Sequence, residues 1–192
     1  MPPSIETHSE RKTSILDAAI QVFGRYGFRK TSVDDLAEAA EISKQGLYLH
    51  YSSKEEIFLE ATKKYLDDGL VLVQQELDKA DASLFKRLMG AMNVWFGRHF
   101  DTFSPGSFDV IEAGNRLSES RVEEYKSAFK AKLAKALAES PELKKFKNVC
   151  TPKEIALVLF EFGLTWKENH SSRDDFMKNV ALCIKASCQL ES

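Results

Sequence analysis

Residues that bend or end helices are scarce in this sequence, which has only 9 glycines and 5 prolines among 192 residues. Folds built from many short strands need more turn residues than this, so the composition favours helices. No apolar run approaches the roughly 20 residues of a membrane-spanning helix. The first ten residues, MPPSIETHSE, lack the basic and apolar regions of a secretory signal. These absences predict a helical, cytoplasmic protein without a membrane segment.

The residues from which enzymes build catalytic centres are also few. The chain has three cysteines and four histidines. It contains no CxxC or HExxH motif and no glycine-rich phosphate loop. We therefore predict that the protein is not an enzyme and holds no metal or cofactor. A helical enzyme or small-molecule carrier, in which the first helices serve only as structure, is the alternative.

Acidic residues are absent from one short stretch, ISKQGLYLHYSSK (42–54), although the whole chain has a formal net charge of −2. Residues 1–60 contain seven basic and ten acidic residues, a net charge of −3. A surface that binds nucleic acid would therefore be local and would not extend over the whole N-terminal segment.

Apolar residues at helical spacing, together with capping residues, predict four helices in the first part of the chain. Gly27 is a stop signal for the first helix, and Ser32 with Asp35 and Ser53 with Glu56 form capping-box patterns at two helix starts. Thr151 with Glu154 forms the same pattern further along the chain. A tight turn around Glu41 separates the second helix from the third. The expected helices span about 9–25, a short segment from Ser32, about 43–51 and about 54–79.

A larger and more aromatic helical body follows, with expected helices at about 83–103, 107–117, 119–139, 152–169 and 172–187. The predicted fold class is all-α with about nine helices. We expect a three-helix N-terminal domain over residues 1–55 and a ligand-binding and dimerisation bundle over residues 56–192.

Two short helices joined by a tight turn form a helix-turn-helix, whose second helix enters the major groove of DNA. The side chains of Lys44 and Gln45 in the first turn could reach base edges, and Gly46 would allow close approach. Other hydroxyl, imidazole and ammonium groups would hold phosphates. Each residue alone has an ordinary alternative in packing or solvation, and their co-occurrence on one helix carries the prediction. The candidate DNA-binding residues are Thr31, Ser43, Lys44, Gln45, Gly46, Tyr48, His50 and Lys54.

Residues 11–59 resemble the DNA-binding domain of the TetR family of transcriptional regulators. The stretches A..VFGRYGF..TSVDDLAEAA and ISKQGLYLHYSSKEE match the family pattern in order and spacing. The resemblance implies a homodimer with one reading helix per subunit, usually a repressor that a small ligand releases from its double-stranded DNA operator. An activator with the same DNA contacts is the alternative. Glu41 stands where the family often has glycine, and Gln45 with Gly46 stands where glycine often follows lysine directly.

The aromatic helices of the C-terminal body suggest a mainly apolar effector pocket with a few polar groups. Methionine would make such a pocket adaptable. A plain hydrophobic core is the alternative, since aromatic residues at helical spacing are normally buried. The tentative pocket residues are Met89, Met92, Trp95, Phe96, His99, Phe103, Phe108, Glu112 and Trp166.

The last two expected helices carry more apolar surface than peripheral helices need. Two such helices from each subunit could form a four-helix dimer interface, with Gly163 permitting close approach. Packing within one chain is the alternative. The tentative interface residues are Leu159, Phe160, Gly163, Phe176, Val180 and Ile184.

Overall fold

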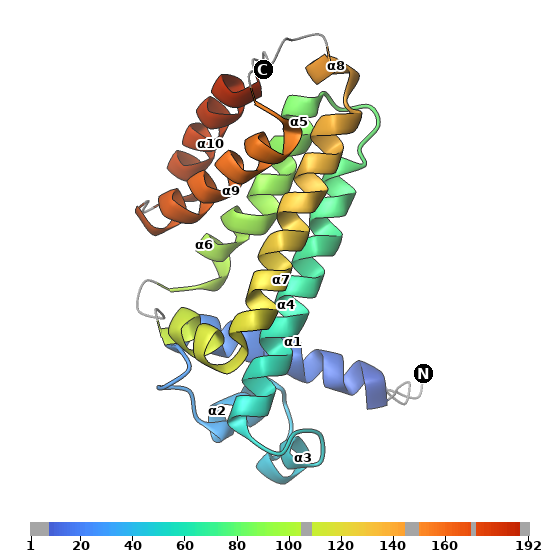
Figure 1. Cartoon of the computed structure of the whole chain (residues 1–192). Coiled ribbons are helices and arrows are strands. Elements are labelled where there is room, and N and C mark those ends of the chain that lie inside the picture. The colour runs from blue at the N-terminus through green and yellow to red at the C-terminus, as the bar shows by residue number, and fades with distance from the viewer. Residues whose placement is uncertain (1–7, 105–108, 145–149, 170–171, 189–192) are drawn as a thin grey trace. The chain divides into compact units, whose positions relative to one another are not determined.

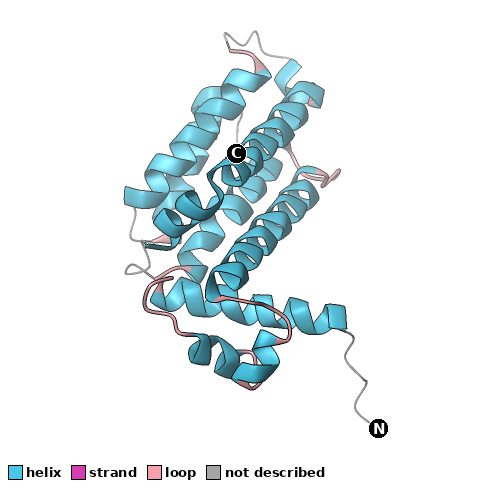
Figure 2. Cartoon of the chain, turned by 60° about the horizontal axis from the view of Figure 1, so that its bottom comes forward, coloured by secondary structure: helices cyan, strands magenta, loops and turns pink. Residues whose placement is uncertain are grey.

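The computed structural model consists of helices joined by short loops (Figure 1). It describes residues 8–104, 109–144, 150–169 and 172–188. Over these residues the secondary structure is helical without any β-strand, as Figure 2 shows, which confirms the all-α prediction. The helices are α1 (His8–Tyr26), α2 (Val33–Ala39), α3 (Lys44–Tyr48), α4 (Lys54–Leu77), α5 (Leu84–Met92), the π-helix η1 (Asn93–Gly97), α6 (Arg98–Thr102), α7 (Asp109–Glu139), α8 (Pro141–Lys144), α9 (Pro152–Asn169) and α10 (Arg173–Cys188).

The chain forms two compact units. The first contains Met1–Leu66 and Thr102–Val122, and the second contains Asp67–Asp101 and Glu123–Ser192. Helices α4 and α7 each contribute residues to both units. A domain boundary at residue 55 stays a prediction. None of the helices in the described ranges is long and apolar enough to span a membrane.

Local signals in the first unit fix the ends of its helices. Gly27 ends α1 with a φ of 84°, a left-handed conformation that glycine adopts without a steric penalty. The predicted capping box at Ser32 is confirmed, because the Ser32 hydroxyl accepts from the Asp35 N–H and the Asp35 carboxylate accepts from the Ser32 N–H. The box predicted at Ser53 and Glu56 is only half right. The Ser53 hydroxyl accepts from the Glu56 N–H, but the Glu56 carboxylate binds the N–H and hydroxyl of the preceding residue, Ser52.

The core of the first unit is formed mainly by α1 to α4, with Ala113 of α7. The Phe58 ring of α4 meets the ring of Phe23 edge-on with centroids 5.1 Å apart, and that of Phe28 at 4.9 Å. Helix α1 packs against α2, and α2 packs against α3. This apolar core fixes the position of α2 and α3 on α1 (Figure 1).

The helices after residue 83 differ from the expected ones in three places. The helix predicted at 83–103 is interrupted, since α5 passes into η1 and then into α6. The prediction of two separate helices at 107–117 and 119–139 is wrong, because α7 runs unbroken from Asp109 to Glu139. Residues 115–120 contain neither glycine nor proline, so nothing in the backbone forces a break there. Residues 141–144, which lie outside the predicted helices, form the short helix α8.

Aromatic side chains fill the core of the second unit. The fully buried Phe129 ring of α7 stacks on Trp95 at a centroid distance of 4.7 Å. It also meets Phe96 edge-on at 5.7 Å and Phe160 at 6.1 Å. Helices α9 and α10 pack against each other and against η1, and α5 packs against α10. The N-terminus of α9 has the predicted capping box, in which the Thr151 hydroxyl accepts from Glu154 N–H and the Glu154 carboxylate accepts from Thr151.

Candidate nucleic-acid interface

Helix α3 is short, and two residues fix its placement. The Leu47 side chain is fully buried in the core of the first unit, at 0% exposure. The Ser43 hydroxyl caps the helix by accepting a hydrogen bond of 3.0 Å from the Gly46 N–H. The helix ends at Tyr48, before the predicted Tyr51, because the Leu47 carbonyl accepts from both the His50 and the Tyr51 N–H and so tightens the last turn.

Three of the predicted contact residues project from the outward side of this helix. Lys44, Gln45 and Tyr48 are exposed, and half of the Tyr48 side chain surface is open to solvent. Ser43 is exposed and Gly46 is partly exposed. The structure therefore brings five of the eight candidate residues together on one short segment.

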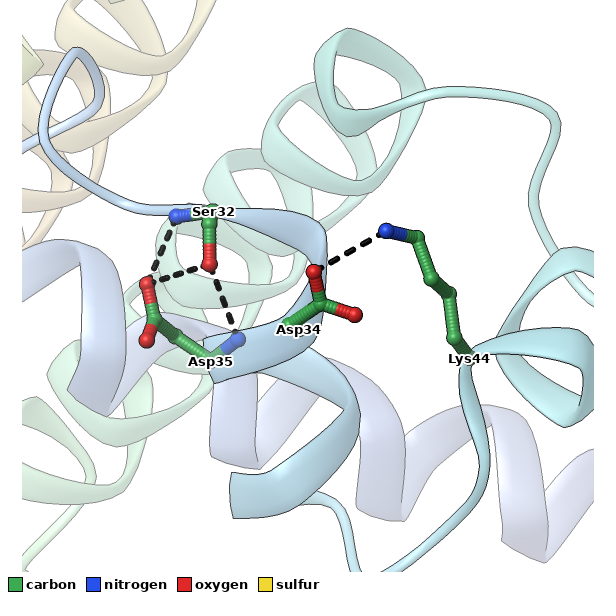
Figure 3. Close-up of polar contacts among 4 residues, drawn as sticks. All are labelled: Ser32, Asp34, Asp35 and Lys44. Atoms are coloured by element: carbon green, nitrogen blue, oxygen red, sulfur yellow. Dashed lines mark hydrogen bonds and ion pairs between the residues drawn. The ribbon is translucent and has the colours of Figure 1, made fainter.

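Lys44 is held by a carboxylate that sequence reasoning missed. Its ammonium lies 2.9 Å from the Asp34 carboxylate of α2, and both side chains remain largely open to solvent (Figure 3). The hydrogen bond that Lys44 donates to Asp34 and the negative charge of Asp34 raise the pKa of Lys44. Asp34 and Lys44 are ten residues apart, and only the crossing of α2 with α3 brings them together. To meet a base or phosphate, Lys44 must exchange this carboxylate for DNA.

Asp35, next to Asp34, has a structural task. Its carboxylate accepts 2.7 Å hydrogen bonds from both the hydroxyl and the N–H of Ser32 (Figure 3). The hydroxyl bond and then the backbone bond lower the pKa of this carboxyl group. Asp35 is therefore ionised at neutral pH and holds the start of α2, while Asp34 faces Lys44.

Thr31 and Lys54 serve the fold in this structure. Thr31 is only 2% exposed, and its hydroxyl donates a 2.6 Å hydrogen bond to the Gly27 carbonyl. The Lys54 ammonium donates to the carbonyls of Phe28 and Thr31, each at 3.0 Å. It also lies 4.5 Å from the centroid of the Phe28 ring. Both side chains therefore tie the turn after α1 to the start of α4, and a phosphate contact by either one stays a prediction.

His50 is half-buried and stacks on His8 of α1, with ring centroids 4.8 Å apart. Burial lowers the pKa of His50, and the nearby His8, Lys12 and Arg11 lower it further. The imidazole is therefore neutral at neutral pH. No local sequence signal links His8 to His50, since the stack joins residues 42 positions apart. A phosphate contact by His50 stays a prediction.

Tyr51 is a packing residue. Its side chain is buried, and its hydroxyl donates to the Lys12 carbonyl at 3.5 Å. Burial raises the pKa of Tyr51 to about 12, so the phenol stays protonated.

Comparison with known proteins identifies this arrangement. Residues 15–61 match the family model described as bacterial regulatory proteins, tetR family. These residues carry the core of the first unit, including α2 and α3. The match falls on the segment whose sequence resembles the TetR family, and it confirms that resemblance.

Curated relatives of the TetR-family segment are named as regulators of transcription. The chain is 33% identical over 116 residues to an uncharacterized HTH-type transcriptional regulator, YfiR, of Bacillus subtilis, covering 58% of this chain and 51% of that protein. It is 42% identical over 69 residues to the HTH-type transcriptional repressor KstR2 of Rhodococcus jostii, covering 35% of this chain and 34% of that protein. The chain thus spans about half or less of the length of these relatives. Such names agree with the prediction that the protein is not an enzyme.

Comparison of folds finds a similarity to solved structures over nearly the whole chain. A TetR-like transcriptional regulator from Rhodococcus sp. RHA1 superposes with a TM-score of 0.65 at 24% identity, covering 94% of this chain and 97% of that one. At this identity the match shows that the two chains share a fold.

Glu41, where the TetR family often has glycine, adopts the conformation that glycine favours. Its φ is 54°, the one positive φ of a non-glycine residue in the described ranges. The Arg11 guanidinium of α1 donates to the Glu41 carbonyl at 3.4 Å. A left-handed L-residue costs about 1–2 kcal/mol. The turn between α2 and α3 therefore has a left-handed residue that is not glycine, which puts its backbone under strain.

We predict that Glu41→Gly raises the free energy of unfolding by about 0.5–1 kcal/mol, because relief of this strain exceeds the extra chain entropy that glycine loses. Thermal unfolding followed by circular dichroism should show an increase of about 2 °C in a chain of this size. Glu38→Gly, on the exposed side of α2, is the matched control and should cost about 1 kcal/mol. Equal losses from both substitutions would contradict the prediction.

The tentative pocket residues fall into different surroundings. Met92 and Phe96 are buried in the core of the second unit, and Met89 and Trp95 pack against that core while partly exposed. His99 is partly exposed on α6. These five residues share one unit, and their lining a pocket stays a prediction.

The other four tentative pocket residues are not gathered with them in the described structure. Phe103 belongs to the first unit, where its ring meets Tyr65 edge-on at 5.5 Å. Phe108 lies outside the described residues. Glu112 and Trp166 lie on α7 and α9, and their side chains are likewise outside what the structure describes.

The tentative interface residues are occupied by packing within their own unit. A Cβ on Gly163 would lie 2.4 Å from Phe96, so this glycine makes room for a ring of the same chain. The outward sides of α9 and α10 carry a different apolar set, formed by Leu157, Val158 and Leu182. A dimer built on these two helices would therefore use the outward set. The inward residues, buried in the core, are Leu159, Phe160, Phe176, Val180 and Ile184.

Proposed function

We propose that this protein is a transcriptional regulator that binds a near-palindromic operator as a homodimer and represses transcription until a small, mainly apolar ligand releases it. The observation that carries the proposal is the seating of α3. Leu47 anchors the helix in the core, and the side chains of Lys44, Gln45 and Tyr48 are exposed to solvent. This is the arrangement in which a helix-turn-helix presents side chains to the major groove.

In the proposed complex, each subunit places one α3 in the major groove. The two copies would occupy grooves about 34–36 Å apart, one turn of the duplex. Gln45 can pair with an adenine edge, and Lys44 can serve a guanine edge or a phosphate. Because the proposed target of the protein is chromosomal DNA, we expect the protein to be in the cytoplasm.

The dimer we propose uses the outward sides of α9 and α10. Leu157, Val158 and Leu182 are large apolar side chains that the second unit leaves exposed. Covering them with the same helices of a second copy would give a self-complementary four-helix contact with two-fold symmetry. This symmetry would match the near-palindromic operator.

The proposed effector acts through the second unit. Support for an apolar ligand comes from the aromatic side chains that form the core there, with Met89 and Trp95 at its edge. A ligand that binds better to another arrangement of these helices would shift the population towards it and weaken operator binding. The coupling would be reciprocal, so operator DNA would lower the affinity for the effector.

Selection of bound fragments from the source genome, followed by affinity measurements on the recovered sequence, tests the proposal. Lys44→Ala should weaken binding and reduce the slope of log affinity against log salt by about 1. Asp34→Asn should strengthen binding, because it removes a negative charge and frees the Lys44 ammonium.

The matched control is Lys135→Ala on α7, a lysine with 71% of its side chain exposed in the second unit. It removes the same charge from the protein and should leave operator affinity and its salt slope unchanged. Failure to enrich any fragment would refute the proposed function. Equal effects of Lys44→Ala and Lys135→Ala would refute the assignment of α3 as the reading helix.

A further inference from the structure

Leu49 is the most exposed of the large apolar side chains in the described part of the chain, at 82%. Its backbone is used by the fold, since its N–H bonds to the carbonyls of Gln45 and Gly46 at 3.2 Å each. Its side chain, by contrast, remains in solvent at the end of α3. Packing within the chain therefore does not account for a leucine at this position.

Helix geometry places Leu49 at the centre of the outward side of α3. The residue keeps helical dihedral angles, with φ −72° and ψ −20°. Successive residues of an α-helix turn by about 100°, so Gln45 and Leu49 each point about 160° away from the buried Leu47. They lie one turn apart on the side that faces away from the core. Lys44 and Tyr48 flank this line on one side.

The neighbours of Leu49 argue against a protein partner at this position. Lys44, Gln45 and Ser52 are exposed and polar. The core of a protein–protein contact is normally a contiguous apolar patch depleted of charged residues. Leu49 has one other exposed large apolar side chain beside it, the ring of Tyr48, and polar side chains around both. So small an apolar area instead matches a surface that is itself mostly polar, with isolated apolar groups.

The major groove of DNA is such a surface. Each thymine presents one methyl group there, beside hydrogen-bonding groups of the bases. Alanine, threonine and phenylalanine contacts to this methyl group are a known means of base readout. A leucine side chain supplies the same kind of apolar surface on a longer arm.

We propose that Leu49 is a specificity-determining residue that packs against the methyl group of a thymine in each operator half-site. This inference rests on the proposed function of α3. Gln45 and Leu49 then read together, the first through hydrogen bonds to an adenine edge and the second through apolar contact one helical turn away. Each half-site should accordingly contain a thymine that cannot be exchanged for a base without the methyl group.

The experiment replaces thymine by uracil in the operator recovered by genomic selection. Uracil pairs like thymine but lacks the methyl group, so it tests the apolar contact alone. Fluorescence anisotropy of the full chain with a fully uracil-substituted operator comes first, and single substitutions then locate the position. We expect affinity to fall about fourfold for each half-site methyl, the equivalent of exposing one buried methylene group.

Leu49→Ala and Gln45→Ala complete a double-mutant cycle with the two operators. Leu49→Ala should bind the thymine operator more weakly than the parent protein does, and should bind the uracil operator with the same affinity as the thymine operator. Gln45→Ala should remain sensitive to uracil. Unchanged thermal unfolding of Leu49→Ala would show that its loss of affinity is not a loss of folding.

Two outcomes overturn the inference while leaving the proposed function intact. One is equal binding of the parent protein to thymine and uracil operators. The other is undiminished uracil sensitivity in Leu49→Ala. If no genomic fragment is enriched at all, the proposed function is refuted, and this inference, which depends on it, is refuted as well.

Discussion

Replacing Phe58 by alanine should lower the free energy of unfolding by about 3–5 kcal/mol. The ring is 1% exposed and meets Phe23 and Phe28 at centroid distances of 5.1 and 4.9 Å. Truncation removes buried apolar surface, leaves a cavity between α1 and α4, and breaks two edge-on ring contacts. The loss is a large part of the roughly 5–15 kcal/mol that stabilises a typical domain.

Urea unfolding followed by far-UV circular dichroism measures this loss. Leu49→Ala is the matched control, because it truncates a large apolar side chain that solvent already surrounds. The control should stay within about 0.5 kcal/mol of the parent protein. Similar midpoints for Phe58→Ala and the parent would mean that the aromatic cluster does not support the first unit.

Gly24→Ala should also destabilise the protein, by about 1–3 kcal/mol. Alanine normally stabilises a helix interior by about 1 kcal/mol relative to glycine, so the expected sign is reversed. The reason is a close approach within the first unit: a Cβ on Gly24 would lie 2.1 Å from the Thr102 carbonyl oxygen. Because the obstacle is a backbone atom, the two segments would have to move apart. The 2.9 Å hydrogen bond from the Ser104 N–H to the Gly24 carbonyl would then be lost.

Gly46→Ala is the control for this effect. A Cβ there would first meet the Ser43 hydroxyl at 3.3 Å, a side-chain atom that can shift. Thermal unfolding of the control should be unchanged or slightly raised, because helix propensity dominates. Parallel behaviour of the two alanine variants would contradict a close packing of α1 against residues 102–104.

The sequence predicted best those features that depend on residues close together in the chain. The capping boxes at Ser32 and Thr151 and the end of α1 at Gly27 need only a few neighbouring residues, and these local patterns are confirmed. The helix-turn-helix and the buried Leu47 were likewise predictable from spacing, since they follow from periodicity within about ten residues.

Features that depend on distant parts of the chain were not predictable in this way. Nothing local indicated that Asp34 would hold Lys44, or that His8 would stack on His50. The sequence showed that α9 and α10 are rich in apolar residues. It did not show which side of each helix faces the core. Phe160 is inward because Phe96 and Phe129 surround it, and such three-body packing has no signature in a single helix.

The ion pair between Asp34 and Lys44 has a consequence for the choice among DNA sequences. Non-specific binding depends almost wholly on attraction to phosphates, whereas specific binding adds base contacts. A carboxylate beside Lys44 weakens attraction to every sequence, but a good base contact can displace it at the operator. A genome offers about 10⁶–10⁹ competing sites, so the ratio of specific to non-specific affinity determines operator occupancy. For a protein that reads DNA with α3, Asp34 would weaken binding everywhere and thereby improve discrimination.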